Sequence, residues 1–324
     1  MKIALLFGEY LADDPVVAQL EDAIRPLGHD CERVSVGEDV AQVLHALRAS
    51  SPDLVFNLAE SFSGKSALES SVAGLLNLLH LRYTGSSPVT LGLAGDKSLT
   101  KKVLAFHGVR TPEFATLYRG AVDWAGELAF PLIVKPPQED ASVGITHKSV
   151  VRDVRELLQT MGSVHSEFQS PVLVEQFIDG REFYVGVLGN QQPQALPVIE
   201  MDFTGFPADR PKIASWAAKW GEDESGGGAE YAGTHSVFPS DLDAELTARL
   251  QEVAVSAFQA LRIRDYGRVD LRVNADGEIF VIEVNPNCYL ERGSEFARAA
   301  AQAGIEYDDL VARIVELASA RYAR

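Results

Sequence analysis

Two acidic side chains and one amide fall close together in the stretch GRVDLRVNADGEIFVIEVNPN, residues 267–287. The turn NADG joins two alternating runs, so Asp270 and Glu283 are expected on facing strands of a hairpin. Apolar residues flank both carboxylates, and a buried charge is costly unless it is paired or binds a metal. Asn285 comes two residues after Glu283 and therefore shares its face. Because these side chains offer the oxygen ligands that Mg²⁺ prefers, the stretch predicts a metal site.

Arg268 comes two residues before Asp270 and is expected on the same side of the hairpin. A guanidinium there could stabilise negative charge that develops on a transferred phosphoryl or acyl group. The alternative is a structural salt bridge between Arg268 and Glu283. The position of Asn285 favours the first interpretation.

A lysine and a loop of small residues follow an apolar strand in PLIVKPPQEDASVGI, residues 131–145. Lys135 ends the strand, and the loop contains Ser142 and Gly144. Lysine can pair with phosphate oxygens, and small residues let backbone N–H groups approach them. The alternative is a lysine solvated at the edge of a sheet.

Two glutamates flank apolar residues in VLVEQFIDGREF, residues 172–183. Glu175 and Glu182 lie seven residues apart, with Phe177 and Ile178 between them. Carboxylates in these positions could accept hydrogen bonds from an adenine amino group and from ribose hydroxyls. The alternative is two surface glutamates.

The stretch AESFSGKSAL, residues 59–68, places Gly-Lys-Ser between a predicted strand and a predicted helix, as a phosphate-binding P-loop does. Ala59 stands where that motif begins with glycine, however, and nothing else in this part of the chain supplies a catalytic set. We expect instead a tight turn at the glycine and a solvated Lys65. Ser66 would cap the next helix, with Glu69 as its capping-box partner.

The elements that carry these residues fall into three units. A chain of 324 residues, 46% of them apolar, is long enough for two or three domains. The first unit (1–94) alternates short apolar strands with helical segments, which indicates a parallel sheet with helices on both faces. The central unit (95–178) and the third unit (179–324) mix strands and helices, so the fold class is α/β and α+β. The predicted strands are 2–7, 31–36, 53–59, 115–119, 131–136, 172–178, 180–190 and the hairpin; the predicted helices are 15–28, 38–50, 69–79, 96–108, 150–162, 241–262 and a terminal helix.

Composition limits the partners and the compartment. The net charge of −17 disfavours nucleic acid, whose phosphates need a basic face. The apolar run at the start is too short for a signal peptide or a membrane span, and no later segment reaches membrane length. Cys31 and Cys288 have no spacing typical of a zinc site or a disulfide framework. We therefore expect a cytoplasmic protein that acts on small molecules.

Taken together, several segments resemble the ATP-grasp superfamily, and closely its D-alanine:D-alanine ligase branch. They are residues 83–112, 131–145, 172–183, 267–273 and 280–287. The resemblance implies an N-terminal preATP-grasp unit with a Rossmann-like parallel sheet, and central and C-terminal units that grip ATP. It also implies an ATP-dependent carboxylate-amine ligase that forms a peptide or amide bond between amino-acid substrates through an acyl phosphate. The alternatives are an ATP-binding protein without ligase activity and an ATP-grasp kinase, and a homodimer is compatible with the resemblance.

The resemblance also implies roles for individual residues. Asp270, Glu283 and Asn285 would bind two Mg²⁺ ions, or Mn²⁺. Arg268, Lys219 and Ser142 would be catalytic, with Arg268 facing the acyl phosphate. Lys97 and Lys135 would contact the ATP phosphates, Glu175 the adenine and Glu182 the ribose. The implied nucleotide contacts are Lys97, Lys135, Ser142, Val143, Gly144, Glu175, Gln176, Phe177, Ile178, Glu182 and Lys219.

The loop from Trp216 to Tyr231 carries Lys219 and three glycines in a row. By the resemblance it is a mobile lid that covers the γ-phosphate and excludes water from the reactive intermediate. The alternative is plain disorder. Trp216 and Trp220 favour ordered packing in a closed state.

Several positions depart from the family pattern and concern the substrates. Glu60 stands near a family histidine, Lys65 near a family acid, and Trp220 in place of a family tyrosine. Asp13 or Asp14 would meet the amino group of the first substrate, and Ser294 would hold the carboxylate of the second.

Cys288 and Tyr289 replace a small glycine-containing turn of the family. Tyr289 would reshape the acceptor pocket, and Glu291, Arg292 and Glu295 add charge around Ser294. We expect that D-alanine is not the preferred pair of substrates, and that an acceptor with positive charge is favoured.

Overall fold

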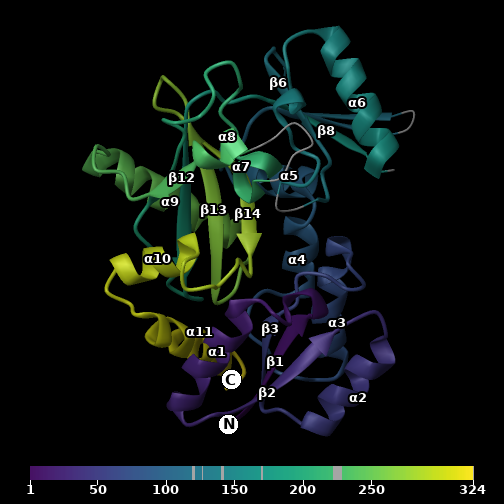
Figure 1. Cartoon of the computed structure of the whole chain (residues 1–324), viewed down its shortest axis with the longest axis vertical. Coiled ribbons are helices and arrows are strands. Elements are labelled where there is room, and N and C mark those ends of the chain that lie inside the picture. The colour runs from purple at the N-terminus through teal and green to yellow at the C-terminus, as the bar shows by residue number, and fades with distance from the viewer. Residues whose placement is uncertain (119–120, 126, 140–141, 169–170, 222–227, 324) are drawn as a thin grey trace.

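The computed structural model describes residues 1–118, 121–125, 127–139, 142–168, 171–221 and 228–323. Within these residues the strands form three sheets. Figure 1 shows the first sheet at the bottom with both chain termini, the central sheet at the upper right, and the third sheet between them on the left. Each sheet lies within one predicted unit, and the exact boundaries between the units stay a prediction.

The first sheet is parallel, with strand order β2-β1-β3. Its strands are β1 (Lys2–Gly8), β2 (Asp30–Val36) and β3 (Leu54–Leu58). Alternate residues of β1 enter two different hydrophobic cores, Ile3 and Leu5 on one face and Ala4 and Leu6 on the other. Helix α1 (Pro15–Ile24) covers the first face, and α2 (Val40–Ser50) and α3 (Glu69–Leu78) cover the second. The prediction of a parallel sheet with helices on both faces is confirmed.

The stretch that resembles a P-loop takes a different local form from the capping box predicted for it. Ser66 begins a short 3-10 turn, η3 (Ser66–Leu68), and α3 starts only at Glu69. Neither Lys65 nor Leu68, the residues that precede η3 and α3, makes a side-chain cap hydrogen bond among the described residues. The capping box is therefore wrong, because the extra turn moves the hydroxyl away from the start of the helix. Lys65 is exposed, as predicted.

The central sheet is antiparallel, with strand order β5-β4-β8-β6-β7. The sheet consists of β4 (Phe114–Tyr118), β5 (Ala121–Ala125), β6 (Leu132–Lys135), β7 (Val150–Val151) and β8 (Val172–Gln176). Helix α6 (Val154–Phe168) packs on it through Val164. The predicted helix 150–162 begins later than expected, because Val150 and Val151 pair with β6 instead. Strand β5 and helix α4 (Pro88–Ala94), which leads to α5 (Lys97–Phe106), were not predicted.

The third sheet has strand order β12-β11-β9-β13-β14, with β10 paired to β9. Its strands are β9 (Arg181–Leu188), β10 (Gln194–Ala195), β11 (Ile199–Asp202), β12 (His235–Val237), β13 (Tyr266–Val273) and β14 (Ile279–Pro286). Helix α9 (Ala244–Ala260) packs on one face. Strands β13 and β14 are the predicted hairpin, with Asp270 opposite Glu283.

The predicted terminal helix is two helices, α10 (Glu295–Gln302) and α11 (Tyr307–Arg321). Gly304, at φ +78°, turns the chain between them. Helix α10 packs on the third sheet, whereas α11 packs against α1 of the first unit, so these elements share one hydrophobic core (Figure 1). The end of the chain therefore ties the third unit to the first.

The remaining short elements are α7 (Trp216–Trp220) and α8 (Gly228–Ala232), with the 3-10 turns η1 (Glu9–Leu11), η2 (Arg25–Leu27) and η4 (His147–Ser149). Among the described residues, no helix combines the length and apolar character that crossing a membrane requires.

Candidate active site

A pocket lies between the central and third sheets. Strands β6 and β8 supply one side, and β13 and β14 the other. The apolar lining contains Pro112, Ile133, Ile145, Phe177, Ile178, Ile213, Ala214 and Ile282. The polar lining contains Lys97, Lys135, Ser142, Glu175, Gln176, Glu182, Lys219, Asp270, Arg272 and Glu283. An apolar slot with charged groups along it fits a ligand that has a flat ring and a charged tail.

Glu175 lies at the floor of the pocket, between two lysines. Its carboxylate oxygens are 2.6 Å from Lys135 Nζ and 2.9 Å from Lys101 Nζ. Burial acts to raise the pKa of Glu175, but the two lysines outweigh burial and lower it. Glu175 is 1% exposed and Lys135 7% exposed on an interior strand, so the alternatives of a surface glutamate and a solvated edge lysine are wrong.

Glu182 is held by Arg272 on the neighbouring strand. Arg272 Nη2 and Nε donate to one Glu182 oxygen at 2.6 and 3.0 Å, and the Tyr184 hydroxyl donates to the other at 3.0 Å. Arg272 also donates to the carbonyls of Ile178 and Lys212. Glu182 is thus a buried side chain that is fixed in orientation, and the alternative of a surface residue is wrong for it too.

The hairpin brings opposite charges together at the pocket, whose lining contains Lys97, Asp270 and Glu283 but not Arg268. Arg268 donates to Asp270 through Nε at 2.7 Å and Nη2 at 3.0 Å, and Lys97 Nζ lies 2.8 Å from Glu283. The alternative pairing of Arg268 with Glu283 is therefore wrong. A bulge in the register after Asp270 lets the consecutive residues Ile282 and Glu283 both line the pocket.

Asp270, Glu283 and Asn285 fit a hard divalent cation by their chemistry. Burial raises the pKa of Asp270 against the effect of Arg268, and the charge of Glu283 adds to the rise. Burial also acts to raise the pKa of Glu283, but Lys97 and Lys219 outweigh it and lower the pKa to about 2. The Asn285 side-chain nitrogen is buried without a hydrogen-bond partner among the described residues. A 180° flip of the amide group exchanges this nitrogen with the side-chain oxygen, so the oxygen can occupy the same position. Two carboxylates and an amide oxygen suit Mg²⁺.

The small-residue loop after β6 is fastened to the segment that precedes α7. Ser142, at φ +66°, donates from its hydroxyl to the Ala214 carbonyl at 2.6 Å. Gly144 has φ +73°, and a side chain there would collide with the Phe168 ring, so glycine is required. Ser142 lines the pocket, whereas Val143 and Gly144 are not among its lining residues.

The two ends of the predicted lid are held together. Ser215, which caps α7, donates to Glu230 of α8 at 2.5 Å, and Arg210 pairs with the same buried carboxylate. Lys219 of α7 lines the pocket. Residues 222–227, with two of the three glycines, lie outside the described residues, so the predicted movement of the lid stays a prediction. The side chain of Trp220 is likewise outside the description.

The predicted substrate residues lie where the first unit meets the third, outside the pocket lining. Asp14 caps α1 by accepting from Val16 N, and the same oxygen accepts from the Tyr289 hydroxyl at 2.7 Å. The Tyr10 hydroxyl donates to Glu60 at 3.3 Å. Asp13 is exposed.

Ser294 and its charged neighbours are mostly engaged within the protein. Ser294 caps α10 and donates to the Tyr289 carbonyl at 3.1 Å. Glu291 accepts from Gln19, and Arg292 pairs with Asp308. Of the three charges predicted around Ser294, Glu295 faces Arg268, at 3.5 Å.

Two charged side chains that hold candidate site residues were not predicted from the sequence. Lys101 follows Lys97 by one helical turn and is buried beneath Glu175. Arg272 follows Asp270 on the same face of β13 and holds Glu182. The spacing of four along a helix and of two along a strand was the available signal.

The structure joins a parallel first sheet to two antiparallel sheets, and these two sheets enclose a pocket of lysines and carboxylates. This combination defines the ATP-grasp class of proteins. A family model described as "D-ala D-ala ligase C-terminus" matches residues 102–316. The chain is 32% identical to a D-alanine–D-alanine ligase of Bordetella petrii, over 99% of this chain and 93% of that protein. It is also 32% identical to the uncharacterised protein y4sG of Sinorhizobium fredii, over 95% of this chain and 88% of that protein.

A solved structure with a similar fold is the D-alanine–D-alanine ligase of Bacillus anthracis complexed with ATP. It has a TM-score of 0.74 at 23% identity, over 98% of this chain and 97% of that one. The chain therefore belongs to the D-alanine–D-alanine ligase family, and the predicted ATP-grasp fold is confirmed. Its activity is that of an ATP-dependent carboxylate-amine ligase.

Proposed function

We propose that the protein joins two amino-acid substrates by an amide bond through an acyl phosphate. A carboxylate oxygen of the first substrate attacks the γ-phosphorus of ATP, and ADP leaves. The amine of the second substrate then attacks the acyl carbon, and inorganic phosphate leaves. The observation that carries this proposal is that the ion pairs Lys97–Glu283 and Arg268–Asp270 lie beside a pocket that has Glu175 at its floor.

The pocket residues are assigned to ATP by their position. Glu175 and Gln176 would meet the adenine edge, Phe177 and Ile178 its faces, and Glu182 the ribose. Lys97, Lys135 and Lys219 would neutralise phosphate oxygens, and backbone N–H groups of the loop Ser142–Gly144 would approach them. In support, Glu175 and Glu182 are held in fixed orientations by buried cations, which preorganises them for hydrogen bonding.

Asp270, Glu283 and Asn285 would hold Mg²⁺, or Mn²⁺, which supplies positive charge to the transferring phosphoryl group. Arg268 lies beside Asp270 and is fixed by it, so its guanidinium is positioned to stabilise charge on the acyl phosphate. The segment 216–231 would exclude water, which otherwise hydrolyses the intermediate.

The substrates would bind toward the first unit, near Asp13, Glu60, Tyr289 and Ser294. The hydrogen bond from Tyr289 to Asp14 places a tyrosine ring at this junction, which supports an acceptor pocket different in shape from one that suits D-alanine. Both cysteines are free thiols, in keeping with the proposed cytoplasmic location, and a homodimer stays a prediction.

An ATP-binding protein without ligase activity and an ATP-grasp kinase are not favoured, because the family is one of ligases and the charged set is complete. The deciding experiment incubates the protein with ATP, Mg²⁺ and pairs of amino acids, measures ADP release and reads the product mass. We expect one amide per ADP for at least one pair. A phosphorylated product that persists with every amine would establish the kinase instead.

A further inference from the structure

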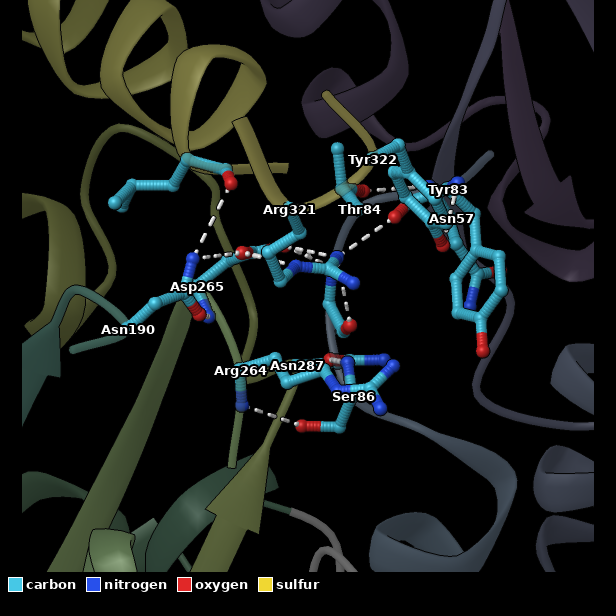
Figure 2. A network of polar contacts seen from close by, with 12 residues as sticks. Asn57, Tyr83, Thr84, Ser86, Asn190, Arg264, Asp265, Asn287, Arg321 and Tyr322 are labelled. Carbon is cyan, nitrogen blue, oxygen red and sulfur yellow. Dashed lines mark hydrogen bonds and ion pairs between the residues drawn. The ribbon is translucent and has the colours of Figure 1, made fainter. Parts of the chain in front are cut away.

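A network of buried polar groups joins distant parts of the chain away from the nucleotide pocket (Figure 2). At its centre is Asp265, which is fully buried directly before β13. Its carboxylate accepts from Gly85 N at 2.8 Å and Asn190 Nδ2 at 2.9 Å. It also accepts from Arg321 Nε at 3.0 Å and Nη2 at 2.8 Å. The donors therefore come from the first unit, from the loop after β9 and from the end of α11.

Arg321 fastens the first unit to the same carboxylate. Its Nη2 also donates to the carbonyls of Tyr83, at 2.9 Å, and Gly85, at 3.4 Å. Burial acts to lower the pKa of Arg321, but the Asp265 charge outweighs it and raises the pKa, so the side chain stays protonated. Breaking a buried pair of this kind leaves an uncompensated charge, so the contact resists loosening.

A second contact holds the other strand of the hairpin at the same end. Asn287, directly after β14, accepts from Ser86 N at 2.8 Å, and Figure 2 shows the two residues facing each other. Gly85 has φ +85°, and a Cβ there would come within 2.3 Å of Asn287 Oδ1. Arg264 N donates to the Ser86 hydroxyl at 3.3 Å. Residues 83–86 thus dock at once on the start of β13 and on the end of β14.

The hairpin held in this way carries the candidate catalytic residues. Arg268 is three residues from Asp265, and Asn285 is two residues from Asn287. Residues 83–86 belong to the unit that carries Asp14 and Glu60, the candidate substrate residues. The network therefore connects the first unit, which carries the candidate substrate residues, to the β13–β14 hairpin, which carries the residues assigned to phosphoryl transfer.

We propose that Asp265 and Arg321 are positioning residues that hold the first unit, with its bound carboxylate substrate, in line with the hairpin for attack on ATP. The inference rests on the proposed function. A misplacement of about 1 Å between reacting groups can cost on the order of a hundredfold in rate. We call the contacts of Asp265, Arg321 and Asn287 with residues 83–86 the clamp. ATP binding depends on the pocket between the other two sheets. Loosening the clamp therefore affects the joining of the substrates and leaves nucleotide affinity unchanged.

The test compares Arg321→Gln and Arg321→Lys with Ile314→Val, a matched control on the same helix. Ile314 is fully buried in the core and lies outside the network. Each variant is titrated with ATP and Mg²⁺ by calorimetry, and assayed with the amino-acid pair that wild type uses. The readouts are the ATP dissociation constant, kcat/KM for the carboxylate, and moles of amide per mole of ADP.

For Arg321→Gln we expect an ATP dissociation constant within about twofold of wild type and a loss of tenfold to a hundredfold in kcat/KM. Amide per ADP falls below one, because a misaligned acyl phosphate is hydrolysed before the amine reaches it. Arg321→Lys recovers part of the loss because it retains the charge. Equal losses in Arg321→Gln and Ile314→Val at matched unfolding midpoints would overturn the proposal.

If Arg321→Gln does not fold, Asn287→Ala serves in its place, because it loosens only the second contact. The expected result is the same: the ATP dissociation constant is retained, while kcat/KM for the carboxylate and the amount of amide per ADP fall. If ATP affinity and kcat/KM fall together in Asn287→Ala, the proposed positioning role of the clamp is wrong. A wild-type protein that releases ADP without forming any amide refutes the proposed function instead. The clamp is then judged on carboxylate-dependent ADP release in the same variants.

Discussion

The Lys101 amine lies 2.9 Å from a carboxylate oxygen of Glu175, and both side chains are 1% exposed. Lys101 also donates to the Thr111 hydroxyl at 2.9 Å. Because Lys135 approaches the other oxygen of Glu175, the glutamate is fixed from two sides beneath the pocket. Lys101 lies outside the pocket lining and contacts Glu175, which is part of that lining.

Replacement of this lysine by methionine, Lys101→Met, removes one of the two cations from a buried carboxylate. We expect a loss of about 3 kcal/mol in the free energy of unfolding, since breaking a buried pair leaves an uncompensated charge. ATP affinity should fall as Glu175 loses its orientation. Chemical denaturation and ATP titration measure the two effects. Lys102→Met, at the neighbouring half-buried position, is the control, and an equal loss there would contradict the assignment.

The same lysine predicts a pH dependence of stability. Burial lowers the pKa of Lys101 from 10.5 to about 8, against the attraction of Glu175, while Lys135 adds to the lowering and Glu283 opposes it. Between these values the unfolded chain holds a proton that the folded chain has released. The contribution of Lys101 to the free energy of unfolding therefore rises with pH from about 8 to 10.5 and is constant below 8. Denaturant unfolding of wild type and Lys101→Met across this range should show the rise in wild type alone.

The metal assignment predicts a loss of turnover without unfolding. Glu283→Gln keeps the shape of the side chain but removes the charge that a divalent cation needs. We expect ADP release to fall by at least about a hundredfold. The protein should stay folded with a lower unfolding midpoint, because Lys97 loses its charged partner. Turnover at the wild-type rate at saturating Mg²⁺ would show that this carboxylate does not hold the ion.

Two lysines separate the P-loop interpretation from the ATP-grasp pocket. Lys65 is exposed in the first unit, whereas Lys135 is buried against Glu175. Lys65→Ala should leave the ATP dissociation constant nearly unchanged and alter KM for a carboxylate or amine substrate. Lys135→Ala should weaken ATP binding by tenfold or more, since it removes a charged contact of about 1.5–3 kcal/mol. A large loss of ATP affinity in Lys65→Ala would revive the P-loop.

The parts of this structure that follow from local patterns could be predicted from the sequence. The NADG turn and the alternation around it were sufficient to place Asp270 and Glu283 on facing strands of a hairpin, because such a turn acts on neighbouring residues. Their direct pairing depends on the bulge after Asp270, which the alternation does not indicate. Lys101 was missed because its partner is 74 residues away, and only the packing of α5 against β8 brings them together. Strand β5 and helix α4 are short, so their periodicity is weak.

Side-chain partners around the substrate residues were beyond prediction for the same reason. The charges near Ser294 were expected to face an acceptor, but Glu291 and Arg292 turn to Gln19 and Asp308. Those contacts depend on how the first unit docks on the third, which is a tertiary property. The network around Asp265 likewise joins residues from positions 83 to 321, and no periodic pattern in the sequence indicates these contacts.

The last prediction concerns the acceptor and rests on Tyr289. Its hydroxyl donates to Asp14 at 2.7 Å, and burial together with the Asp14 charge raises the pKa of the hydroxyl, so it stays a donor at neutral pH. The ring thus spans from the turn after β14 to the start of α1, where a small turn would leave open space. We expect that D-alanine with D-alanine is not the preferred pair, because a bulky ring at this junction reshapes the acceptor pocket.

Two variants divide the effect of the ring from that of its hydrogen bond. Tyr289→Phe removes only the contact with Asp14, and Tyr289→Gly removes the ring as well. If the ring sets the acceptor, Tyr289→Gly shifts the ratio of kcat/KM between acceptors by about tenfold or more, within the 1–3 kcal/mol that pocket shape supplies, and Tyr289→Phe shifts it less. Steady-state kinetics on a panel of acceptors measure both. The inference is wrong if wild type uses the D-alanine pair with a kcat/KM well above that of every other pair.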